Sequence, residues 1–582
     1  MKNLILTLSC MIWFCAAALS QNTRVSWWAF TSGFKVSSNG ITQSQGVVGQ
    51  SFVGSLQGTN IRVETGFLSN PSISGGPPPA ATFTVTTVND TGHGSLRWAI
   101  ESANTAAGLN TIAFNIPGSG VQTIAPVTPL PPLTDPVIID GYTQPGASRN
   151  TNQIGEANNA VLRIQLTGPG AQSGTRGLVL RGGNSVVRGL IINRFETGIL
   201  LDGVGGNTIQ GNFIGTDSLG SINSGNRTGV RILSPDNTIG GSSPSSFNII
   251  SANVAHGIRI DGNSATNNLV LGNYLGTTSS GNGDITNGAG VWLEAPGNFV
   301  GGTTLLSRNI ILGGSNPAII LPAGNAGGNA IRYNFVGTNA SGTAGLGAAG
   351  IYIYTPNNIV SGNVISGSRG VLFQDAAGNI MQGNLVGLSA DGTTALANNA
   401  TGIRLTRAPR TLIGGLTPDA RNVITVLGHG IDISSSDSNT VQGNYIGTNA
   451  AGTVGLIPGG AAGSGISITA STNNLIGGAV AGARNTIANS LIGINITAGS
   501  RGNIVQGNFI GTNASGTAAI PNRTRGVGII TPQGSTITRE NLIGGHEPGA
   551  GNVISGNVGP GIWISGAQNN TIRGNCIGLA AN

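Results

Sequence analysis

The sequence contains few charged and few aromatic residues. Only 8% of its 582 residues are Asp, Glu, Lys or Arg, and only 4% are Phe, Trp or Tyr. Lysine occurs only as Lys2 and Lys35, so nearly all of the positive charge is arginine, and the formal net charge is +7. No basic cluster and no nucleic-acid-binding motif accompanies this charge. The composition therefore argues against nucleic acid as a partner and favours weak attraction to acidic polysaccharides or anionic surfaces.

Cysteine and long apolar runs are equally scarce. A lysine followed by an apolar run over residues 4–18 and by small residues predicts a secretory signal peptide over residues 1–20. Cys10 and Cys15 belong to this segment, so only Cys576 remains afterwards and no intrachain disulfide can form. The apolar run is too short to span a membrane, and no other segment qualifies. We expect a secreted or cell-surface protein with no transmembrane segment after signal cleavage.

The abundant residue is glycine, with 98 copies, and it recurs within short repeated phrases. One phrase, Gly-Asn-aromatic or aliphatic-aliphatic-Gly, returns every 50 to 67 residues. A second phrase, Gly-aliphatic-any-aliphatic, occurs fourteen times between Gly177 and Gly561 at spacings of 20 to 35 residues, with Ala318 replacing the glycine once. A period of this kind is the signature of a stacked solenoid. Cys576 takes the aromatic position of the last copy of the first phrase, where we expect a buried small side chain.

Each repeat contains three short apolar runs that are rich in β-branched residues and bounded by Gly and Asn. Runs of this length with period-two alternation predict strands. Three strands per repeat, stacked in register, predict a parallel β-helix of about fourteen coils with a rise of roughly 4.8 Å per coil. Asn tolerates left-handed turns and can hydrogen-bond along the axis, so we interpret the repeated Asn residues as structural. Inserts such as residues 337–343 and 511–517 predict loops on one side of the solenoid.

These repeats cover residues 137–582 and resemble the right-handed parallel β-helix repeat family, which implies an all-β solenoid. The preceding segment, residues 82–136, resembles the lead-in of large secreted bacterial repeat proteins. The matching stretches are Phe83–Asn104 and Asn110–Gly118, followed by Val137–Gly146 at the start of the solenoid. Residues 95–106 are the helix candidate of this segment, with one apolar face formed by Leu96, Ala99, Ile100 and Ala103. We expect the segment to cap the solenoid, because the open end of a stacked core needs a cover.

Two further regions are predicted between the signal peptide and the cap. Residues 21–70 contain runs typical of short strands at 27–30, 46–54 and 63–68, which predict a small β-rich unit. Residues 71–81 are rich in Pro and Gly and predict a linker. The sequence does not indicate a role for the small unit.

Candidate functional residues lie on the Gly-aliphatic-any-aliphatic strand. The first and third residues after its Gly should point inward, and the second and fourth should point outward. Aligning the repeats by this Gly produces two outward rows, in which arginines, aromatic rings and carboxylates gather on coils two to seven: Arg231, Arg259, Trp292 and Tyr352 in the first row, and Asp202, Asp261, Glu294 and Tyr354 in the second. Asp261 and Glu294 fall in the same register on adjacent coils, so their side chains should start roughly 5 Å apart.

This patch allows functional and structural interpretations. Trp292 and Tyr352 could stack on sugar rings, while an arginine could pair with a uronate carboxylate. Asp261 and Glu294, with Arg259 beside them, could perform acid/base chemistry on a glycosidic bond or share a Ca²⁺ ion through oxygen ligands. The structural interpretation is that both carboxylates simply pair with arginines on an exposed sheet face.

One further motif has a counterpart in enzymes of the same fold. Gly428-His429-Gly430 resembles one motif of the polygalacturonase-type glycoside hydrolases. The Asn-Thr-Asp, Asp-Asp and Arg-Ile-Lys motifs of that family are missing, since neighbouring coils offer Asp375, Arg404 and Asp432 instead. His256 occupies the position of His429 six coils earlier. A histidine before the strand Gly is therefore interpreted as a residue that the repeat tolerates at this position and not as a catalyst.

From these observations we predict a secreted, non-enzymatic β-helix scaffold with an adhesin-like or glycan-binding role. Its partner would be a polysaccharide or a cell-surface glycan, with no cofactor or metal required, although the Ca²⁺ alternative stays open. The second interpretation is a polysaccharide lyase or glycoside hydrolase that acts on acidic polysaccharide through Asp261, Glu294 and Arg259. A third, the passenger of an autotransporter, would need sequence beyond Asn582.

Overall fold

The structure is a computed structural model that describes most of the chain. The described residues are 35–38, 42–46, 54–58, 61–65, 80–324, 326–347, 349–396, 401–457 and 460–579, with the first four ranges described by their backbone alone. The chain divides into two compact units, residues 1–78 and 79–582. The predicted signal peptide lies outside the described residues, and the predicted domain boundaries stay predictions. No helix in the described part of the chain is long and apolar enough to cross a membrane.

The first unit contains a small four-stranded sheet, which agrees with the predicted β-rich unit. Its strands are ordered β1-β2-β4-β3, with the bounds β1 (Lys35–Ser38), β2 (Thr42–Gly46), β3 (Gly54–Gly58) and β4 (Ile61–Thr65). Strands β1 and β3 pair antiparallel with their neighbours, and β2 pairs parallel with β4. The predicted run at 63–68 overlaps β4, the run at 46–54 meets only the end of β2 and the start of β3, and the run at 27–30 lies outside the described residues.

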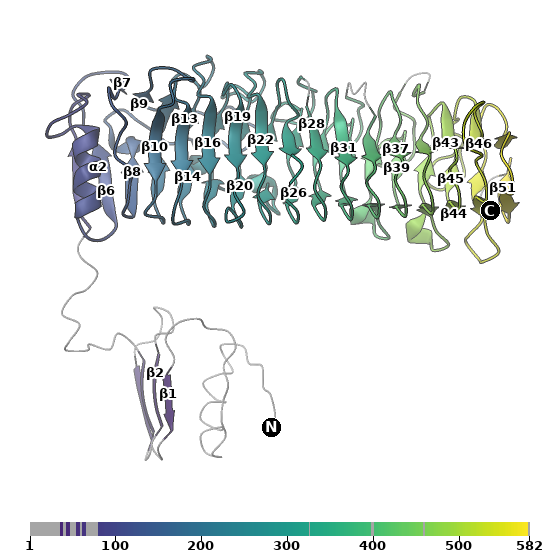
Figure 1. Cartoon of the computed structure of the whole chain (residues 1–582), viewed down its shortest axis with the longest axis horizontal. Helices are drawn as coiled ribbons and strands as arrows, with labels where there is room; N and C mark the ends of the chain where they lie inside the picture. The colour runs from purple at the N-terminus through teal and green to yellow at the C-terminus, as the bar shows by residue number, and fades with distance from the viewer. Residues whose placement is uncertain are drawn as a thin grey trace. The chain divides into compact units, whose positions relative to one another are not determined.

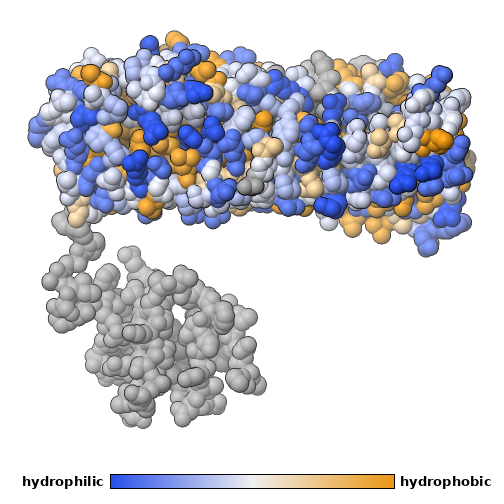
Figure 2. Space-filling view, in the orientation of Figure 1, coloured by the Kyte–Doolittle hydropathy of each residue, from blue (hydrophilic) through white to orange (hydrophobic). Residues whose placement is uncertain are grey.

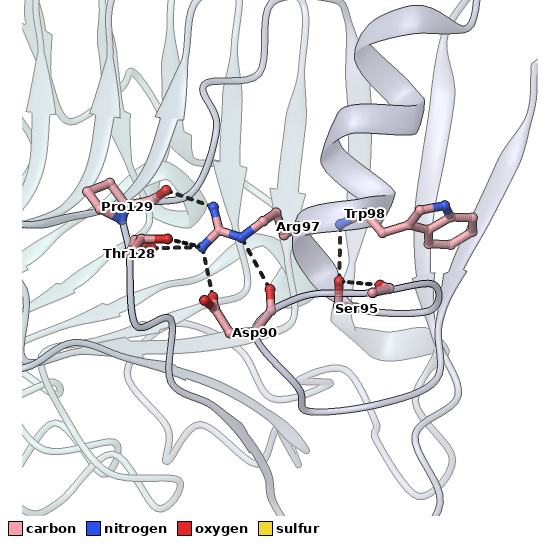
Figure 3. Close-up of polar contacts among 7 residues, drawn as sticks. Asp90, Ser95, Arg97, Trp98, Thr128 and Pro129 are labelled. Carbon is pink, nitrogen blue, oxygen red and sulfur yellow. Dashed lines mark hydrogen bonds and ion pairs between the residues drawn. The ribbon is translucent and has the colours of Figure 1, made fainter.

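The second unit begins with a helix that covers the first coil. Helix α2 (Leu96–Thr105) lies against strands β5 (Thr82–Val85) and β6 (Asn110–Phe114) at the N-terminal end of the solenoid (Figure 1). Its apolar face is the predicted one, because its buried residues are Leu96, Ala99, Ile100 and Ala103. Ser95 caps the helix by accepting a hydrogen bond from the Trp98 N–H at 3.2 Å, as Figure 3 shows.

A second contact fastens this helix to the loops beside it. The guanidinium of Arg97 pairs with the Asp90 carboxylate at 2.7 Å and donates to the carbonyl oxygens of Thr128 and Pro129, both at 2.9 Å (Figure 3). Both ionic side chains are mostly buried, with exposed fractions of 13% and 18%. One side chain therefore joins three segments of the cap, and the position of α2 over the core is fixed by polar as well as apolar contacts.

The fourteen Gly-aliphatic-any-aliphatic strands form one parallel sheet, here called sheet 1. Its strands, side by side in Figure 1, are β10 (Arg176–Leu180), β13 (Thr197–Leu201), β16 (Thr228–Ile232), β19 (His256–Ile260), β22 (Ala289–Leu293), β25 (Ile319–Leu321), β28 (Gly350–Ile353), β31 (Gly370–Gln374), β34 (Ile403–Thr406), β37 (Ile431–Ser434), β40 (Ile466–Thr469), β43 (Ile492–Thr497), β46 (Arg525–Ile530) and β49 (Ile562–Ser565).

Sheet 2 follows sheet 1 within each coil and continues into the cap. Its strands pair in the order β5, β6, β8 (Val137–Asp140), β11 (Val186–Arg188), β14 (Thr208–Gln210), β17 (Thr238–Gly240), β20 (Leu269–Leu271), β23 (Phe299–Val300), β26 (Ala330–Arg332), β29 (Ile359–Ser361), β32 (Ile380–Gln382), β35 (Leu412–Gly414), β38 (Thr440–Gln442), β41 (Leu475–Gly477), β44 (Ile504–Gln506), β47 (Leu542–Gly544) and β50 (Thr571–Arg573). All of these pairings are parallel.

Sheet 3 completes each coil, and several coils turn into it through a short 3₁₀ turn. Its strands are β7 (Gln122–Ile124), β9 (Ile164–Thr167), β12 (Leu190–Asn193), β15 (Phe213–Ile214), β18 (Ile249–Ile250), β21 (Tyr274–Leu275), β24 (Ile310–Ile311), β27 (Phe335–Val336), β30 (Val364–Ile365), β33 (Leu385–Val386), β36 (Val423–Ile424), β39 (Tyr445–Ile446), β42 (Thr486–Ile487), β45 (Phe509–Ile510), β48 (Val553–Ile554) and β51 (Cys576–Ile577). The 3₁₀ turns are η1 (Gly141–Thr143), η2 (Pro244–Ser246), η3 (Leu305–Ser307), η4 (Pro418–Ala420) and η5 (Ala481–Ala483).

Three stacked parallel sheets confirm the predicted right-handed parallel β-helix. One continuous aliphatic core runs through its interior. In sheet 1 the first and third residues after the Gly point into this core, as Ile258 and Ile260 illustrate with no exposed surface. Burying such side chains contributes about 1.5–3 kcal/mol each, so the stack of aliphatic side chains is the main source of stability.

Buried asparagines form a continuous ladder at the corner between sheets 2 and 3, which confirms their structural role. Each side-chain amide donates to the side-chain oxygen of the Asn one coil further on, at 2.8–3.2 Å. The ladder consists of Asn212, Asn248, Asn273, Asn309, Asn334, Asn363, Asn384, Asn422, Asn444, Asn485, Asn508, Asn552 and Asn575. Because a buried amide without a partner costs about 1–3 kcal/mol, the ladder holds every coil in register.

The inserts also stack upon one another, on one side of the solenoid as predicted. Backbone N–H groups of later inserts donate to carbonyl oxygens of earlier ones, as in Ser279 to Gly220 at 2.8 Å and Ala450 to Gly392 at 2.9 Å. The inserts lie against outward-facing aromatic rings at the start of sheet 3 strands. A Cβ added to Gly452 would meet the Tyr445 ring at 2.7 Å, which leaves room only for glycine.

The prediction that Cys576 is buried is wrong, since its side chain is exposed. In the two-residue strands of sheet 3 the second residue enters the core and the first faces outward. Outward residues become buried only where an insert or a neighbouring coil covers them, as at Phe335, which is 2% exposed. No described residue covers Cys576 in this way.

Candidate functional site

The outward row of sheet 1 has the register that the repeats predicted. Arg231 pairs with Arg259, Arg259 with Trp292, Trp292 with Ile320, and Ile320 with Tyr352 on successive strands. The side chains of Arg231 and Arg259 are 36% and 31% exposed, and Trp292 and Tyr352 are partly exposed. Arginines and aromatic rings therefore follow one another along the axis on an open sheet face.

The two candidate carboxylates are joined to these arginines in a continuous chain of polar contacts. Arg231 donates two hydrogen bonds to the Asp261 carboxylate, from Nε to Oδ1 at 3.1 Å and from Nη2 to Oδ2 at 2.6 Å. Arg259 lies between the two acids, with its Nη2 2.9 Å from Glu294 Oε2 and 3.5 Å from Asp261 Oδ2. The indole N–H of Trp292 donates to Glu294 Oε1 at 2.6 Å.

All four carboxylate oxygens of this chain accept a hydrogen bond. Asp261 is the more enclosed of the two acids, with a side-chain exposure of 10%, and Glu294 is 32% exposed. The hydrogen bond with Asp261 raises the pKa of Arg231 above its usual value. This arrangement is the ion-paired one that the structural interpretation described, and it fixes the orientation of the Trp292 ring.

His256, which the repeat pattern alone did not mark as a functional residue, belongs to the same cluster. Its ring centroid lies 5.0 Å from that of Trp292, and its Nδ1 is buried without a hydrogen-bond partner in the described residues. Burial, followed by the charge of Arg259, lowers the pKa of His256 to about 4, so the ring is neutral near pH 7. His429, its equivalent, instead accepts a hydrogen bond from the Ser464 N–H at 2.9 Å. The Nδ1 of His429, the histidine of the Gly-His-Gly motif, thus has a hydrogen-bond partner, whereas the Nδ1 of His256 has none in the described residues.

The remaining candidate residues lie near the cluster but do not join it. Asp202 lies two strands from Asp261 and pairs with Arg181 at 3.4 Å. Tyr352 and Tyr354 lie on and directly after β28, two strands beyond Trp292, and burial raises the pKa of Tyr354. The spacing of strands in a sheet places Trp292 and Tyr352 about 10 Å apart along the axis.

Both ends of the ion-paired chain reach solvent, since the side chains of Arg231 and Glu294 are 36% and 32% exposed. A shallow hollow exists elsewhere, at the turn from sheet 1 to sheet 2, where Asn184, Val204, Pro235 and Asp236 line it. Figure 2 shows hydrophobic residues interspersed with hydrophilic ones along the length of the solenoid. Among the described residues no three His, Cys, Asp or Glu side chains are grouped to hold a metal ion, and the Ca²⁺ alternative stays a prediction.

The fold and this face define the class of the protein: a right-handed parallel β-helix with an ionic and aromatic row on the outside of one sheet. No family model and no curated protein matches the sequence. Similar solved structures include the Dettilon tailspike protein, with 15% identity over 83% of this chain and 66% of that one and a TM-score of 0.32.

Two alginate-related structures are similar at the same low level. The A-module of a mannuronan C-5 epimerase from Azotobacter vinelandii has 12% identity over 86% of this chain and all of that one, with a TM-score of 0.26. An alginate lyase has 11% identity over 88% of this chain and 93% of that one, with a TM-score of 0.31. These values are too low to bear on what this chain binds.

Proposed function

We propose that this protein is a non-enzymatic β-helix scaffold that binds a glycan along the outward face of sheet 1. The observation that carries the proposal is the row of Trp292 and Tyr352, partly exposed and in register, beside ionic side chains of fixed orientation. Exposed aromatic rings on an otherwise polar face are typical of a binding surface. The proposal includes secretion and display at the cell surface, as the signal peptide predicts.

The geometry of the row suits a sugar chain. Trp292 and Tyr352 are separated by about 10 Å, close to the length of a disaccharide unit in an extended polysaccharide. An aromatic ring offers a flat apolar face to the C–H groups of a sugar ring. Arg259 stands beside Trp292, held in a fixed orientation by Glu294, as a donor for sugar hydroxyl groups.

The state of the two carboxylates supports binding without turnover. A glycoside hydrolase needs two carboxyl groups that act on opposite sides of the glycosidic bond, one of them as a proton donor. Here both oxygens of Asp261 and both oxygens of Glu294 are engaged by Arg231, Arg259 or Trp292. Neither acid is left oriented toward a ligand. The second candidate function, a lyase or hydrolase on acidic polysaccharide, rests on the placement of these two acids in one register.

The test compares binding and product release on a panel of neutral and acidic polysaccharides, with and without Ca²⁺. We expect wild-type protein to be retarded in a gel that contains its glycan, and Trp292→Ala/Tyr352→Ala to bind about tenfold more weakly. Trp563→Ala is the matched control, because Trp563 is an exposed residue of the same row on β49. Turnover that disappears in Asp261→Ala/Glu294→Ala would refute the scaffold proposal.

A further inference from the structure

Three arginines share one position at the corner between sheets 2 and 3. Each directly precedes an Asn of the buried ladder, and each guanidinium stacks on the outward aromatic ring of the next coil: Arg308 on Phe335 at 3.7 Å, Arg421 on Tyr445 at 4.0 Å, and Arg484 on Phe509 at 4.2 Å. We call Arg308, Arg421 and Arg484 the arginine row. Because the same contact recurs at three equivalent positions, it is a feature of the repeat.

Each arginine of the row is also held by its Nε. The three N–H groups donate to backbone carbonyl oxygens of the next coil: Arg308 to Tyr333 at 3.3 Å, Arg421 to Gly443 at 3.0 Å, and Arg484 to Gly507 at 2.9 Å. A ring contact and a hydrogen bond together fix the plane of each guanidinium. A group that is ordered before binding loses less entropy when a ligand arrives.

The Nη atoms of the row have no partner within the described residues. None of these Nη atoms donates a hydrogen bond to a described residue. None of them is among the fully buried nitrogen atoms without a partner either, so they are accessible to solvent. The three side chains are half-buried, so it is the two-nitrogen end of each fork that reaches solvent. This end is the part of a guanidinium that binds a carboxylate or sulfate with two parallel hydrogen bonds.

No described carboxylate lies within 4.0 Å of an arginine of the row, whereas Arg231, Arg259 and Arg404 of sheet 1 are each paired with a carboxylate. Burial without a compensating charge lowers the pKa of Arg308 to about 10 and also lowers the pKa of Arg484. Both side chains are still protonated near pH 7. The row therefore presents uncompensated positive charge that an anion would stabilise.

The spacing of the row matches a ligand that runs along the solenoid. The three arginines precede strands β24, β36 and β42, and these strands are separated by four and then two steps of sheet 3. The separations along the axis are therefore about 19 Å and about 10 Å. Both are multiples of two steps, and each coil of the row, which enters sheet 3 through a 3₁₀ turn, is followed by a coil that carries the aromatic ring.

We propose that the arginine row is a binding site for an acidic polysaccharide whose carboxylate or sulfate groups pair with the guanidinium ends. A charge on every second sugar would meet the two-step spacing. Nucleic acid fits less well, because single strands bind through bases that stack on open aromatic rings, and here the guanidinium groups cover Phe335, Tyr445 and Phe509. The site lies on a different corner from the sheet 1 face and does not depend on it.

The chain itself supplies a neutral replacement for these arginines. Phe247 directly precedes Asn248 in an earlier coil and therefore occupies the same position. It is 1% exposed and packs in one apolar cluster with Tyr274, the ring of the next coil. Arg→Phe substitutions in the row should thus keep the packing on the ring and remove the charge, the free N–H groups and the hydrogen bond of each Nε to the next coil.

The experiment measures binding of the triple variant Arg308→Phe/Arg421→Phe/Arg484→Phe to polygalacturonate, dextran sulfate, uncharged dextran and oligothymidylate. We expect wild-type protein to bind at least one acidic polysaccharide, with affinity that falls as salt rises, and the triple variant to bind it at least about tenfold more weakly. The two acidic probes distinguish carboxylate from sulfate. The melting temperature should change by less than about 2 °C, because packing is kept.

The matched control removes three charges elsewhere: Arg404→Ala/Arg407→Ala/Arg573→Ala. It should bind the acidic probe within about threefold of wild type if the row, rather than net charge, is the site. Equal losses in both triple variants, unchanged binding in the Phe variant, or tighter binding to oligothymidylate than to either polysaccharide would each overturn the proposal. Trp292→Ala/Tyr352→Ala should leave polyanion binding unchanged, which separates this site from the sheet 1 face.

Discussion

Arginines play opposite roles on two sides of this solenoid. On sheet 1, Arg231 and Arg259 each meet a carboxylate from a neighbouring coil, and their charge is balanced. In the arginine row, Arg308 and its counterparts meet an aromatic ring and a backbone carbonyl, and their charge is not balanced. The residue type is the same and both sets stand in register. The side chain that an arginine meets on the next coil therefore decides its role. An acid neutralises the arginine, whereas an aromatic ring leaves its charge available to a ligand.

The comparison has a physical basis in the stacking distance. Coils lie about 4.8 Å apart, so a long side chain on either side reaches the residue of the next coil that lies two positions beyond its own register partner. Where that position carries an acid, as at Asp261 beside Arg231, an ion pair forms without any cleft. Where it carries Tyr445 or Phe509, the guanidinium lies over the ring and its two Nη atoms have no partner among the described residues.

The largest loss of stability is expected when an asparagine of the ladder next to the arginine row is replaced. Asn444 donates to the carbonyl oxygens of Ile413 and Gln442 and to Asn485, and it directly precedes the Tyr445 ring that Arg421 covers. Asn444→Ala leaves several buried groups without partners and should cost about 3 kcal/mol. The loss is measured as a shift of the urea midpoint. Polyanion binding should weaken as well, while glycan binding on sheet 1 persists.

Asn449→Ala is the control for this substitution, because Asn449 hydrogen-bonds only within its own exposed insert, to Thr453. Its cost should stay below about 1 kcal/mol. If both variants lose the same stability, the ladder is not the frame of the arginine row.

A smaller loss of stability is expected when an arginine of sheet 1 is deprived of its carboxylate partner. Asp261→Ala removes the partner that Arg231 grips, and it leaves half-buried positive charge without compensation. The free energy of unfolding should fall by about 2 kcal/mol. The variant should also gain affinity for dextran sulfate, since Arg231 and Arg259 would then resemble the arginine row. Both changes are measured by urea unfolding and affinity electrophoresis.

Asp375→Ala provides the matched control, because Asp375 pairs with Arg407 at 2.6 Å and both side chains are at least half exposed. Its urea midpoint should not change measurably. An unchanged affinity of Asp261→Ala for dextran sulfate would show that pairing does not restrain the arginines of sheet 1.

The smallest effect concerns pH and His256. Its pKa is about 4 in the folded chain against an ordinary 6.5, because of burial and the charges of Arg259 and Arg227, with Glu294 and Asp261 opposing. Between these values the unfolded chain binds a proton that the folded chain does not. Stability from this group is therefore full above pH 6.5 and falls as the pH drops toward 4. The full pKa shift would correspond to about 2 kcal/mol at pH 5, and because solvent screens the partly exposed ring we expect a loss of about 1 kcal/mol.

His256→Gln should reduce the loss of stability between pH 8 and pH 5, as measured by urea unfolding at both values. The carboxylates that titrate nearby are present in both proteins, so the difference reports the histidine. An identical loss in the variant would mean that His256 is protonated in the folded chain.

Much of the fold was predictable because its signals are local and repeated. The apolar face of Leu96, Ala99, Ile100 and Ala103 follows from helical spacing alone. The row from Arg231 to Tyr352 follows from a period of two and from one Gly that marks every copy. The arginine row carried a signal that was overlooked: an arginine directly before the ladder Asn in one coil and a ring directly after it in the next.

Other features could not be read from the repeats. Cys576 occupies an aromatic position, yet burial there depends on the insert and side chains that cover it, and its prediction was wrong. His256 and His429 occupy the same position of the repeat, but only His429 has a backbone donor for its Nδ1. Such differences arise from neighbours on adjacent coils, which single repeats do not contain.

The sequence by itself determined the parallel β-helix, its inward aliphatic positions and its asparagine ladder, because each follows from alternation and period within one coil. The tertiary structure alone decided which arginines are paired. Partners such as Arg231 and Asp261 lie 30 residues apart, and the spacing between copies varies with the inserts. The physical reason is that ion pairing and stacking act over a few ångströms between coils, and only the stacked coils place those side chains at that distance.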